Sequence, residues 1–250
     1  MIDRKKIGAG QTATVYEWED GRVLKLFVPG YPEEAAEREY RNASALSGMG
    51  FAKPKAFDMV SWNGRRGIVY ERVDGEALDA WVLRTGDLPR CAEWMAGLHR
   101  DILSNAAGDA PSCKAFLRDN LGRLPAEAAE MREEALRLLD TLEDGDALCH
   151  GDFHPGNILL SEGRPTAIDF MNICRGPRAY DVARTVFLVE YTPVPADAPD
   201  REQLLRYKKE LAGLYLREMG MTREAIAGYL SVIRTSRRGE CPDEKPAEWA

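Results

Sequence analysis

The segment HGDFHPGNIL, residues 150–159, is more informative about this chain than any other part of it. Asp152 is followed five positions later by Asn157, and the proline and glycine between them predict a loop. The apolar run 158–160 predicts a short strand after the loop, and a second apolar stretch ends at Asp169. Two carboxylates and an amide are therefore expected to gather around one loop and two short strands.

This set of side chains suits the transfer of a phosphoryl group from a nucleotide. One carboxylate orients or deprotonates the attacking hydroxyl, and oxygen ligands hold Mg²⁺ against the phosphates. Kinase catalytic loops have the same His-x-Asp start, the same Asp-to-Asn spacing and a metal-binding aspartate on a following strand. We therefore expect Asp152 to be the catalytic base, with Asn157 and Asp169 as the Mg²⁺ ligands.

A second triplet, His99-Arg100-Asp101, matches the protein-kinase wording more closely but lacks the spacing. The residue five positions beyond Asp101 is Ala106, which cannot hold a metal. Apolar residues around the triplet recur with helical period, so it is expected to lie within a helix. We therefore interpret His99 and Asp101 as structural residues.

The start of the chain has the features of a phosphate-binding sheet. Gly8 and Gly10 precede the first predicted strands, where small residues let backbone N–H groups approach phosphates. This is similar to a kinase glycine-rich loop, although Ala13 stands in place of its third glycine. Lys25, in an otherwise apolar strand, is expected to pair with the α- and β-phosphates. The alternative is a lysine that faces solvent.

The pattern of the chain predicts an α+β fold whose composition changes near residue 75. Alternation predicts strands at 14–18, 22–28, 55–61 and 67–72, with one helix at 33–47. Beyond this point helices are predicted at 76–84, 89–104, 125–143, 177–190, 201–219 and 222–236. The polar tail after Arg238 is expected to be loosely held. We thus predict a small antiparallel-sheet lobe at residues 1–75 and a helical lobe at 76–250.

Composition excludes several classes of protein. The 250 residues are 44% hydrophobic and 30% charged, as in an ordinary globular protein, and the net charge of −7 argues against a nucleic-acid-binding role. No apolar run approaches the roughly 18–20 residues of a membrane span, and the N-terminus shows no secretory signal. Five scattered cysteines fit a reducing compartment, so a cytoplasmic protein without nucleic-acid or membrane partners is expected.

The loop sequence resembles that of the aminoglycoside phosphotransferase and choline kinase family. The resemblance lies in Gly151, where protein kinases have arginine, in the His-Pro-Gly inside the loop, and in Met171, where protein kinases have glycine. It covers residues 5–190. It implies a bilobal, protein-kinase-like fold that binds ATP, with GTP as the alternative, together with Mg²⁺. The acceptor implied is a small-molecule hydroxyl, and the protein is expected to be a monomer or homodimer.

The same resemblance assigns further residues. Glu39 matches the family's helix glutamate and would hold Lys25, with Glu37 as the alternative partner. Glu71 and Val73 lie in the segment that would form the hinge, whose backbone binds adenine; a simple linker is the other interpretation. Asp181, in a Tyr-Asp-hydrophobic-Ala element, would support the catalytic loop.

Other functions remain to be weighed against this one. A protein kinase should show an Ala-Pro-Glu-like anchor after Asp169, and none is present. A non-catalytic nucleotide-binding module would be expected to have lost one of the catalytic parts, yet all are present. A metallohydrolase triad of His150, Asp152 and His154 would need a further histidine or a cysteine pair nearby.

The acceptor itself is not identified by the sequence. The resemblance implies that the segment after residue 190 closes the acceptor pocket. Residues 191–250 contain ten acidic and ten basic side chains, so no acidic surplus indicates a cationic substrate. A neutral or zwitterionic metabolite is therefore favoured over a polycationic antibiotic.

Overall fold

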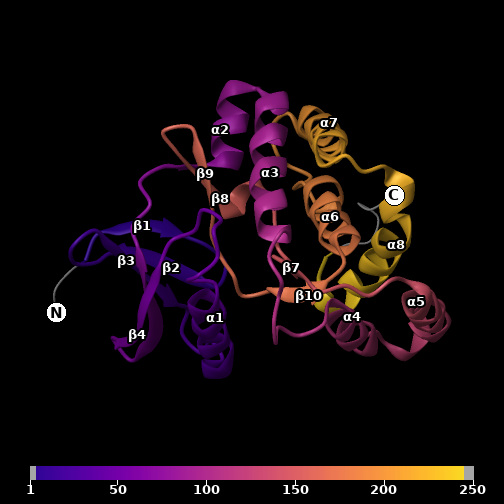
Figure 1. The fold of residues 1–250 in the computed structure, drawn as a ribbon, viewed down its shortest axis with the longest axis horizontal. Helices are drawn as coiled ribbons and strands as arrows, with labels where there is room; N and C mark the ends of the chain where they lie inside the picture. The colour runs from indigo at the N-terminus through magenta and orange to yellow at the C-terminus, as the bar shows by residue number, and fades with distance from the viewer. Residues whose placement is uncertain (1–3, 245–250) are drawn as a thin grey trace.

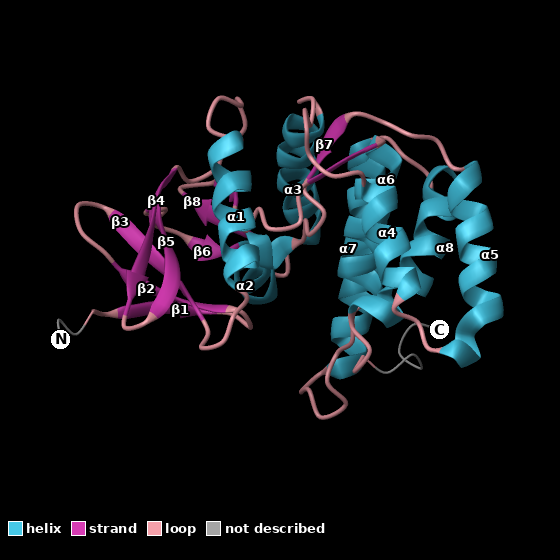
Figure 2. Cartoon of the chain, turned by 90° about the horizontal axis from the view of Figure 1, so that it is seen from below, coloured by secondary structure: helices cyan, strands magenta, loops and turns pink. Residues whose placement is uncertain are grey.

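The computed structural model describes residues 4–244, and the chain in it changes from sheet to helix along its length. The strands of the N-terminal part lie at one end of the molecule and α4 to α8 at the other (Figures 1 and 2). The predicted α+β class, with an antiparallel sheet followed by helices, is confirmed. The division at residue 75 stays a prediction, and the outer ends of its two ranges, 1–3 and 245–250, lie outside the described residues.

The N-terminal sheet is antiparallel, with strand order β1-β2-β3-β5-β4. Its strands are β1 (Lys6–Ala9), β2 (Ala13–Glu17), β3 (Arg22–Phe27), β4 (Ala56–Trp62) and β5 (Arg65–Glu71). Two hairpins turn at Asp20-Gly21 and Asn63-Gly64, where φ is positive at all four residues. Asx-Gly pairs are the usual sequence for such turns, because their backbone twist matches that of the flanking strands.

Side chains of β3 alternate between the two faces of this sheet, and the alternation places Lys25. Leu24 and Leu26 are buried in a small cluster with Val69 on the outer face, against aromatic side chains. Lys25 therefore points to the opposite face, which α1 (Glu33–Ala45) covers. The alternative of an outward-facing, solvated lysine is wrong.

The C-terminal part is built from helices with two small sheets between them. The helices are α2 (Leu78–Thr85), α3 (Leu88–Leu103), α4 (Cys113–Gly122), α5 (Ala129–Thr141), α6 (Arg178–Val186), α7 (Arg201–Met219) and α8 (Arg223–Glu240). A π-helical turn, Phe187–Tyr191, extends α6, and short 3₁₀ turns occur at Ala126–Ala128 and Pro155–Asn157. None of the helices within residues 4–244 combines the length and apolar character that a membrane crossing requires.

The small sheets flank the predicted catalytic loop. β7 (Ala147–Cys149) leads into the loop and pairs with β10 (Cys174–Gly176). β8 (Ile158–Ser161) leaves it and pairs with β6 (Glu76–Ala77) and β9 (Arg164–Ala167). The predicted strand at 158–160 is thus present, whereas the apolar stretch that ends at Asp169 is a strand only as far as Ala167 in β9. Neither α4 nor the β7–β10 pair is expected from the sequence.

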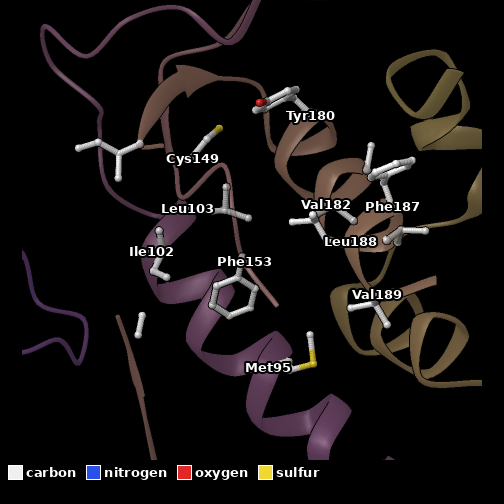
Figure 3. Close-up of a cluster of buried hydrophobic side chains, with 14 of the residues drawn as sticks. Met95, Ile102, Leu103, Cys149, Phe153, Tyr180, Val182, Phe187, Leu188 and Val189 are labelled. Carbon is white, nitrogen blue, oxygen red and sulfur yellow. The ribbon is translucent and has the colours of Figure 1, made fainter. Parts of the chain in front are cut away.

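The helical core forms around α3, and the loop residue Phe153 is part of it. Figure 3 shows the Phe153 ring among Met95, Ile102 and Leu103 of α3, with Val182 of α6 nearby. The Phe153 ring is fully buried. The residue next to the predicted base is therefore fixed by core packing.

A buried polar network crosses this core and joins α3, α6 and α7. His99 Nε2 lies 2.9 Å from the Asp181 carboxylate, and its Nδ1 lies 2.6 Å from the hydroxyl of Tyr215. The His99 ring also stacks on Phe153, with the centroids 4.2 Å apart. All of these side chains are buried. His99 thus occupies a structural position within a helix, whereas Asp101 is exposed.

We predict that His99→Ala lowers the free energy of unfolding by about 3–5 kcal/mol, because it leaves a buried carboxylate short of a partner and opens a cavity. Denaturant unfolding followed by circular dichroism would measure the change. Asp101→Ala, one half-turn along the same helix, is the matched control and should leave the unfolding midpoint nearly unchanged. Equal midpoints for wild type and His99→Ala would contradict the structural interpretation.

Candidate active site

The loop after β7 is held at its backbone by two charged side chains of α6. The Asp181 carboxylate accepts hydrogen bonds from the N–H groups of His150, at 2.6 Å, and Gly151, at 2.9 Å. The Arg184 guanidinium donates to the carbonyl of Gly151 at 3.1 Å. The peptide units just before Asp152 are therefore bonded on both sides. This geometry agrees with the supporting position expected for Asp181.

Gly151 is the residue type that this position demands. Its φ is +75°, and a Cβ atom built there would lie 2.2 Å from the carbonyl oxygen of Asn172. Any side chain would therefore force the loop away from its neighbour. The difference from the arginine of protein kinases thus has a steric reason in this chain.

Arg184 is fixed by the end of the last helix. It is fully buried and pairs with both carboxylate oxygens of Glu240, at 2.8 and 2.5 Å. Burial acts to lower the pKa of Arg184, but the carboxylate of Glu240 outweighs it and keeps the pKa above its ordinary value. The expectation that the chain after Arg238 is loosely held is wrong for Gly239 and Glu240, which end α8 and bring Glu240 into this contact. Residues 245–250 of that tail lie outside the described residues.

Asp152 and Asn157, the two ends of the predicted motif, are joined directly. The Asn157 Nδ2 group donates to the Asp152 backbone carbonyl at 2.9 Å and to its Oδ2 at 3.1 Å. The amide nitrogen of Asn157 is thus committed to Asp152, which leaves the amide oxygen as the end of that side chain with lone pairs to offer. The Asp152 side chain is 28% exposed and can meet a substrate.

Lys25, Glu39 and Asp169 form a second group. Lys25 Nζ lies 2.7 Å from Glu39 Oε1 and 3.1 Å from Asp169 Oδ2. The Tyr70 hydroxyl donates to the same Glu39 oxygen at 3.1 Å. The structure therefore places Glu39 against Lys25. Glu37 is half-buried and lies 3.6 Å from Arg41 instead.

The electrostatics of this group keep Lys25 charged. Burial acts to lower the pKa of Lys25, but the carboxylates of Asp169 and Glu39 outweigh it, so the pKa lies above its ordinary value. Burial raises the pKa of Glu39, against the opposing charge of Lys25. A positively charged group that is 14% exposed therefore lies beside Asp169, which is 32% exposed. Such a pair can bind a phosphate and its counter-ion together.

Asp169 and Asn157, the predicted metal ligands, carry the kind of oxygen atoms that Mg²⁺ prefers. Asp169 contributes a partly exposed carboxylate and Asn157 an amide oxygen, and both are hard oxygen donors. In the described part of the chain no group of three or more His, Cys, Asp or Glu side chains is arranged to hold a metal. Two protein ligands fit a Mg²⁺ ion whose other ligands are phosphates and water, and they do not fit an all-protein cage.

The histidines of the loop are used differently. His150 is fully buried, its Nε2 lies 3.1 Å from the Ile168 carbonyl, and its Nδ1 accepts from the Asp152 amide at 3.3 Å. Burial lowers the pKa of His150, so the ring is neutral. His154 Nδ1 accepts from the Gly156 amide at 3.1 Å and caps the 3₁₀ turn. Both rings hydrogen-bond to backbone groups, and this use of their nitrogens disfavours a metallohydrolase triad.

The remaining predicted residues lie in the first turn and in the linker. Gly8 pairs with Val15 in the sheet, and the Gly10 amide donates to Ala13 in the turn. Glu71 ends β5, and both its amide and its carboxylate bond to Lys55. No hydrogen bond or ion pair within residues 4–244 joins Gly8, Gly10, Glu71 or Val73 to the Asp152 or Lys25 groups.

The linker lies directly on the helical part. A Cβ atom at Gly75 would be 2.4 Å from the backbone oxygen of Leu160 in β8, so the linker backbone packs tightly there. β6 then adds a short strand to the sheet that leaves the catalytic loop. The segment between the two parts of the chain is thus packed against β8, the strand that leaves the catalytic loop. It is more constrained than a simple linker would be.

Comparison with known proteins gives one family and many similar folds. Residues 3–218 match the model of the phosphotransferase enzyme family. No curated protein sequence matches significantly. An aminoglycoside-3′-phosphotransferase of type VIII has a similar structure, with a TM-score of 0.66 and 20% identity over 91% of this chain and 90% of that one.

Two other solved structures are similar over nearly the whole chain. A choline/ethanolamine kinase family protein from Mesorhizobium loti has a TM-score of 0.63 and 14% identity over 99% of this chain and 84% of that one. Amicoumacin kinase, solved with AMP-PNP, Ca²⁺ and Ami, has a TM-score of 0.59 and 17% identity over 98% and 84%. The kinase-like fold is thus confirmed, as is the family that the loop sequence indicated. With its family model matched over most of its length, the chain belongs to the phosphotransferase enzyme family.

Proposed function

We propose that this protein transfers the γ-phosphoryl group of ATP to a hydroxyl group of a small molecule. The observation that carries the proposal is the pairing of Asp152 with Asn157, together with the Lys25–Asp169 ion pair. These four side chains supply a base, a phosphate-binding cation and two oxygen ligands, which phosphoryl transfer requires.

Asp152 would act on the acceptor. Its carboxylate receives the proton of the acceptor hydroxyl as the hydroxyl oxygen bonds to the γ-phosphorus. The bond between that phosphorus and the β–γ bridging oxygen breaks, and ADP leaves. The hydrogen bond from Asn157 Nδ2 to Asp152 Oδ2 fixes the orientation of the base, so that little reorganisation is needed.

Lys25 and Asp169 would act on the nucleotide. Lys25, held by Glu39, provides positive charge to the α- and β-phosphates. Asp169 and Asn157 would hold Mg²⁺, which would supply positive charge beside the phosphates of the bound nucleotide. We further propose that Gly8 and Gly10 approach the phosphates through their backbone, and that the adenine is bound by the backbone at Glu71 and Val73. The Glu71 amide already donates to the Lys55 carbonyl, so adenine would bond to the Glu71 carbonyl and not to this amide.

A small acceptor is favoured over a protein acceptor by the segment that follows Asp169. Residues 170–177 lead from Asp169 to the start of α6, and β10 within them pairs with β7. So few residues, partly used in a ladder, leave no room for the activation segment on which protein kinases bind a peptide. This supports the small-molecule interpretation.

The charge pattern supports a neutral or zwitterionic acceptor. Several acidic side chains after residue 187 are already paired with arginines. Glu190 pairs with Arg223, and Glu240 and Glu244 both pair with Arg237. An acid in such a pair offers less attraction to a polycationic ligand than a free one does.

We expect ATP consumption to rise with one class in a panel of sugars, amino alcohols, nucleosides and aminoglycosides, with neutral or zwitterionic members preferred. Asp152→Asn should lower this rate by at least about a hundredfold, because the general base is lost. The Asp152→Asn affinity for AMP-PNP should stay close to that of the wild type. A coupled assay for ADP and calorimetry with AMP-PNP give the two measurements.

Turnover of Asp152→Asn within tenfold of wild type would contradict the assignment of the base. Efficient phosphorylation of several aminoglycosides would contradict the charge argument but leave the phosphotransferase proposal standing.

A double-mutant cycle identifies the partner of Lys25. Lys25→Ala and Glu39→Ala should each weaken AMP-PNP binding, and a double-mutant cycle should give a coupling of roughly 1 kcal/mol or more between them. Glu37→Ala, on the same helix, is the control and should show no coupling to Lys25. A cycle with the reverse pattern would transfer the role to Glu37.

A further inference from the structure

Asn42 of α1 joins the N-terminal part of the chain to the backbone that follows Asp169. Its Nδ2 group donates to the carbonyl of Phe170 at 2.9 Å and to the carbonyl of Met171 at 3.1 Å. An amide nitrogen carries two hydrogens, so a single asparagine can satisfy both carbonyls at once. The contact to Phe170 spans 128 positions of sequence, and the two bonds hold the carbonyls of the two residues directly after the predicted metal ligand.

The backbone conformation at Asp169 is strained and needs contacts that stabilise it. Its φ is +66°, a left-handed conformation that costs a non-glycine residue free energy unless the surroundings enforce it. Phe170, the next residue, is buried against Phe51 with ring centroids 6.1 Å apart. The Tyr31 hydroxyl lies 3.1 Å from the sulfur of Met171. Asn42 is the side chain that binds the backbone of both residues.

α1 therefore supports two parts of the site from one face. Glu39 and Asn42 are three residues apart, which places them side by side on a helix. Glu39 binds Lys25, and Asn42 binds the chain after Asp169. Lys25 also contacts Asp169. The two side chains of α1 therefore act on the same ion pair, one through Lys25 and the other through the backbone after Asp169.

We propose that Asn42 is a positioning residue, which holds Asp169 in the conformation that directs its carboxylate to the nucleotide-bound Mg²⁺. This inference rests on the proposed function. It goes beyond it by assigning the metal-dependent part of nucleotide affinity to a side chain that touches neither metal nor nucleotide. Loss of the Asn42 bonds frees the Phe170 and Met171 carbonyls and lets Asp169 relax from its strained φ.

The test compares AMP-PNP binding with and without Mg²⁺ by calorimetry. Asn42→Leu keeps the side-chain size but removes both donors, and Asn42→Ser keeps a polar group too short to reach both carbonyls. Each should weaken binding of AMP-PNP in Mg²⁺ by about tenfold, as is typical for the loss of a group that orients a metal ligand. Binding of AMP-PNP in EDTA should change by less than about twofold, because Lys25 and Glu39 remain in place.

Two controls separate positioning from general stability. Tyr40→Phe removes a hydroxyl that donates to the Phe57 carbonyl from the same helix, away from Asp169, and should leave both affinities unchanged. In an Asp169→Ala background, Asn42→Leu should have no further effect on binding in Mg²⁺, since the group it positions is gone. Circular dichroism confirms that each variant is folded.

The outcomes are distinct. Wild-type affinity that does not depend on Mg²⁺ would overturn the proposed function and this inference with it. A Mg²⁺-dependent wild type whose affinities Asn42→Leu and Asn42→Ser leave unchanged would overturn the inference alone. Equal losses with and without Mg²⁺, or an undiminished effect in the Asp169→Ala background, would show that Asn42 is merely structural.

Discussion

The buried carboxylate of Asp181 fixes the loop that carries Asp152 and ties this loop to α3 and α6. It accepts two backbone N–H groups from the loop and lies within hydrogen-bonding distance of His99. Burial alone would raise the pKa of Asp181, but His99 and the Gly151 amide hold the pKa below its ordinary value. A carboxylate that stays charged inside a core has to keep its donors, so the loop cannot move without exposing that charge.

The anchoring of the loop also fixes Asp152, which we propose as the base. The anchored peptides lie directly before Asp152, and the Phe153 ring after it is buried against α3 (Figure 3). Asp152 is thus fixed on both sides, while its own side chain stays partly exposed. Arg184 adds the end of α8 to the same support through Glu240. Rigid support of a partly exposed carboxylate is what preorganised catalysis by the proposed base requires.

A second support comes from α1 and acts on the side of the site where we propose that the nucleotide binds. The helix carries Glu39 against Lys25 and Asn42 against the chain after Asp169. The site is therefore assembled from two rigid pieces, the α6-anchored loop and the α1-anchored ion pair. In the second piece burial acts to lower the pKa of Lys25, but the carboxylates of Asp169 and Glu39 beside it keep that pKa above its ordinary value.

Much of the site could be predicted, because it is encoded locally. The Asp152-to-Asn157 spacing and the alternation around Lys25 are patterns of a few residues, and the structure forms contacts at both. The choice between Glu39 and Glu37 was also encoded: Glu39 lies between Ala36 and Ala43 on the buried face of α1, whereas Glu37 does not.

The supports were harder to predict because they join distant segments. Arg184 and Glu240 are 56 positions apart, and Asn42 and Phe170 are 128 apart. No local pattern marks such pairs, although Arg184 stands three residues after Asp181 on one helix face. The β7–β10 pair, with three residues in each strand, is too short to give an alternation signal. Helix α4 was missed although Ser112 provides an N-cap for it.

Amide hydrogen exchange at His150 and Gly151 measures how firmly Asp181 anchors the loop. If a buried Asp181 carboxylate anchors the loop, these two amides should exchange only through near-global unfolding, like the helices of the core. Asp181→Asn should make both exchange far faster while the α3 core stays protected. Exchange of the His150 and Gly151 amides in the wild type at the rate of an exposed loop would show that Asp181 does not anchor the loop.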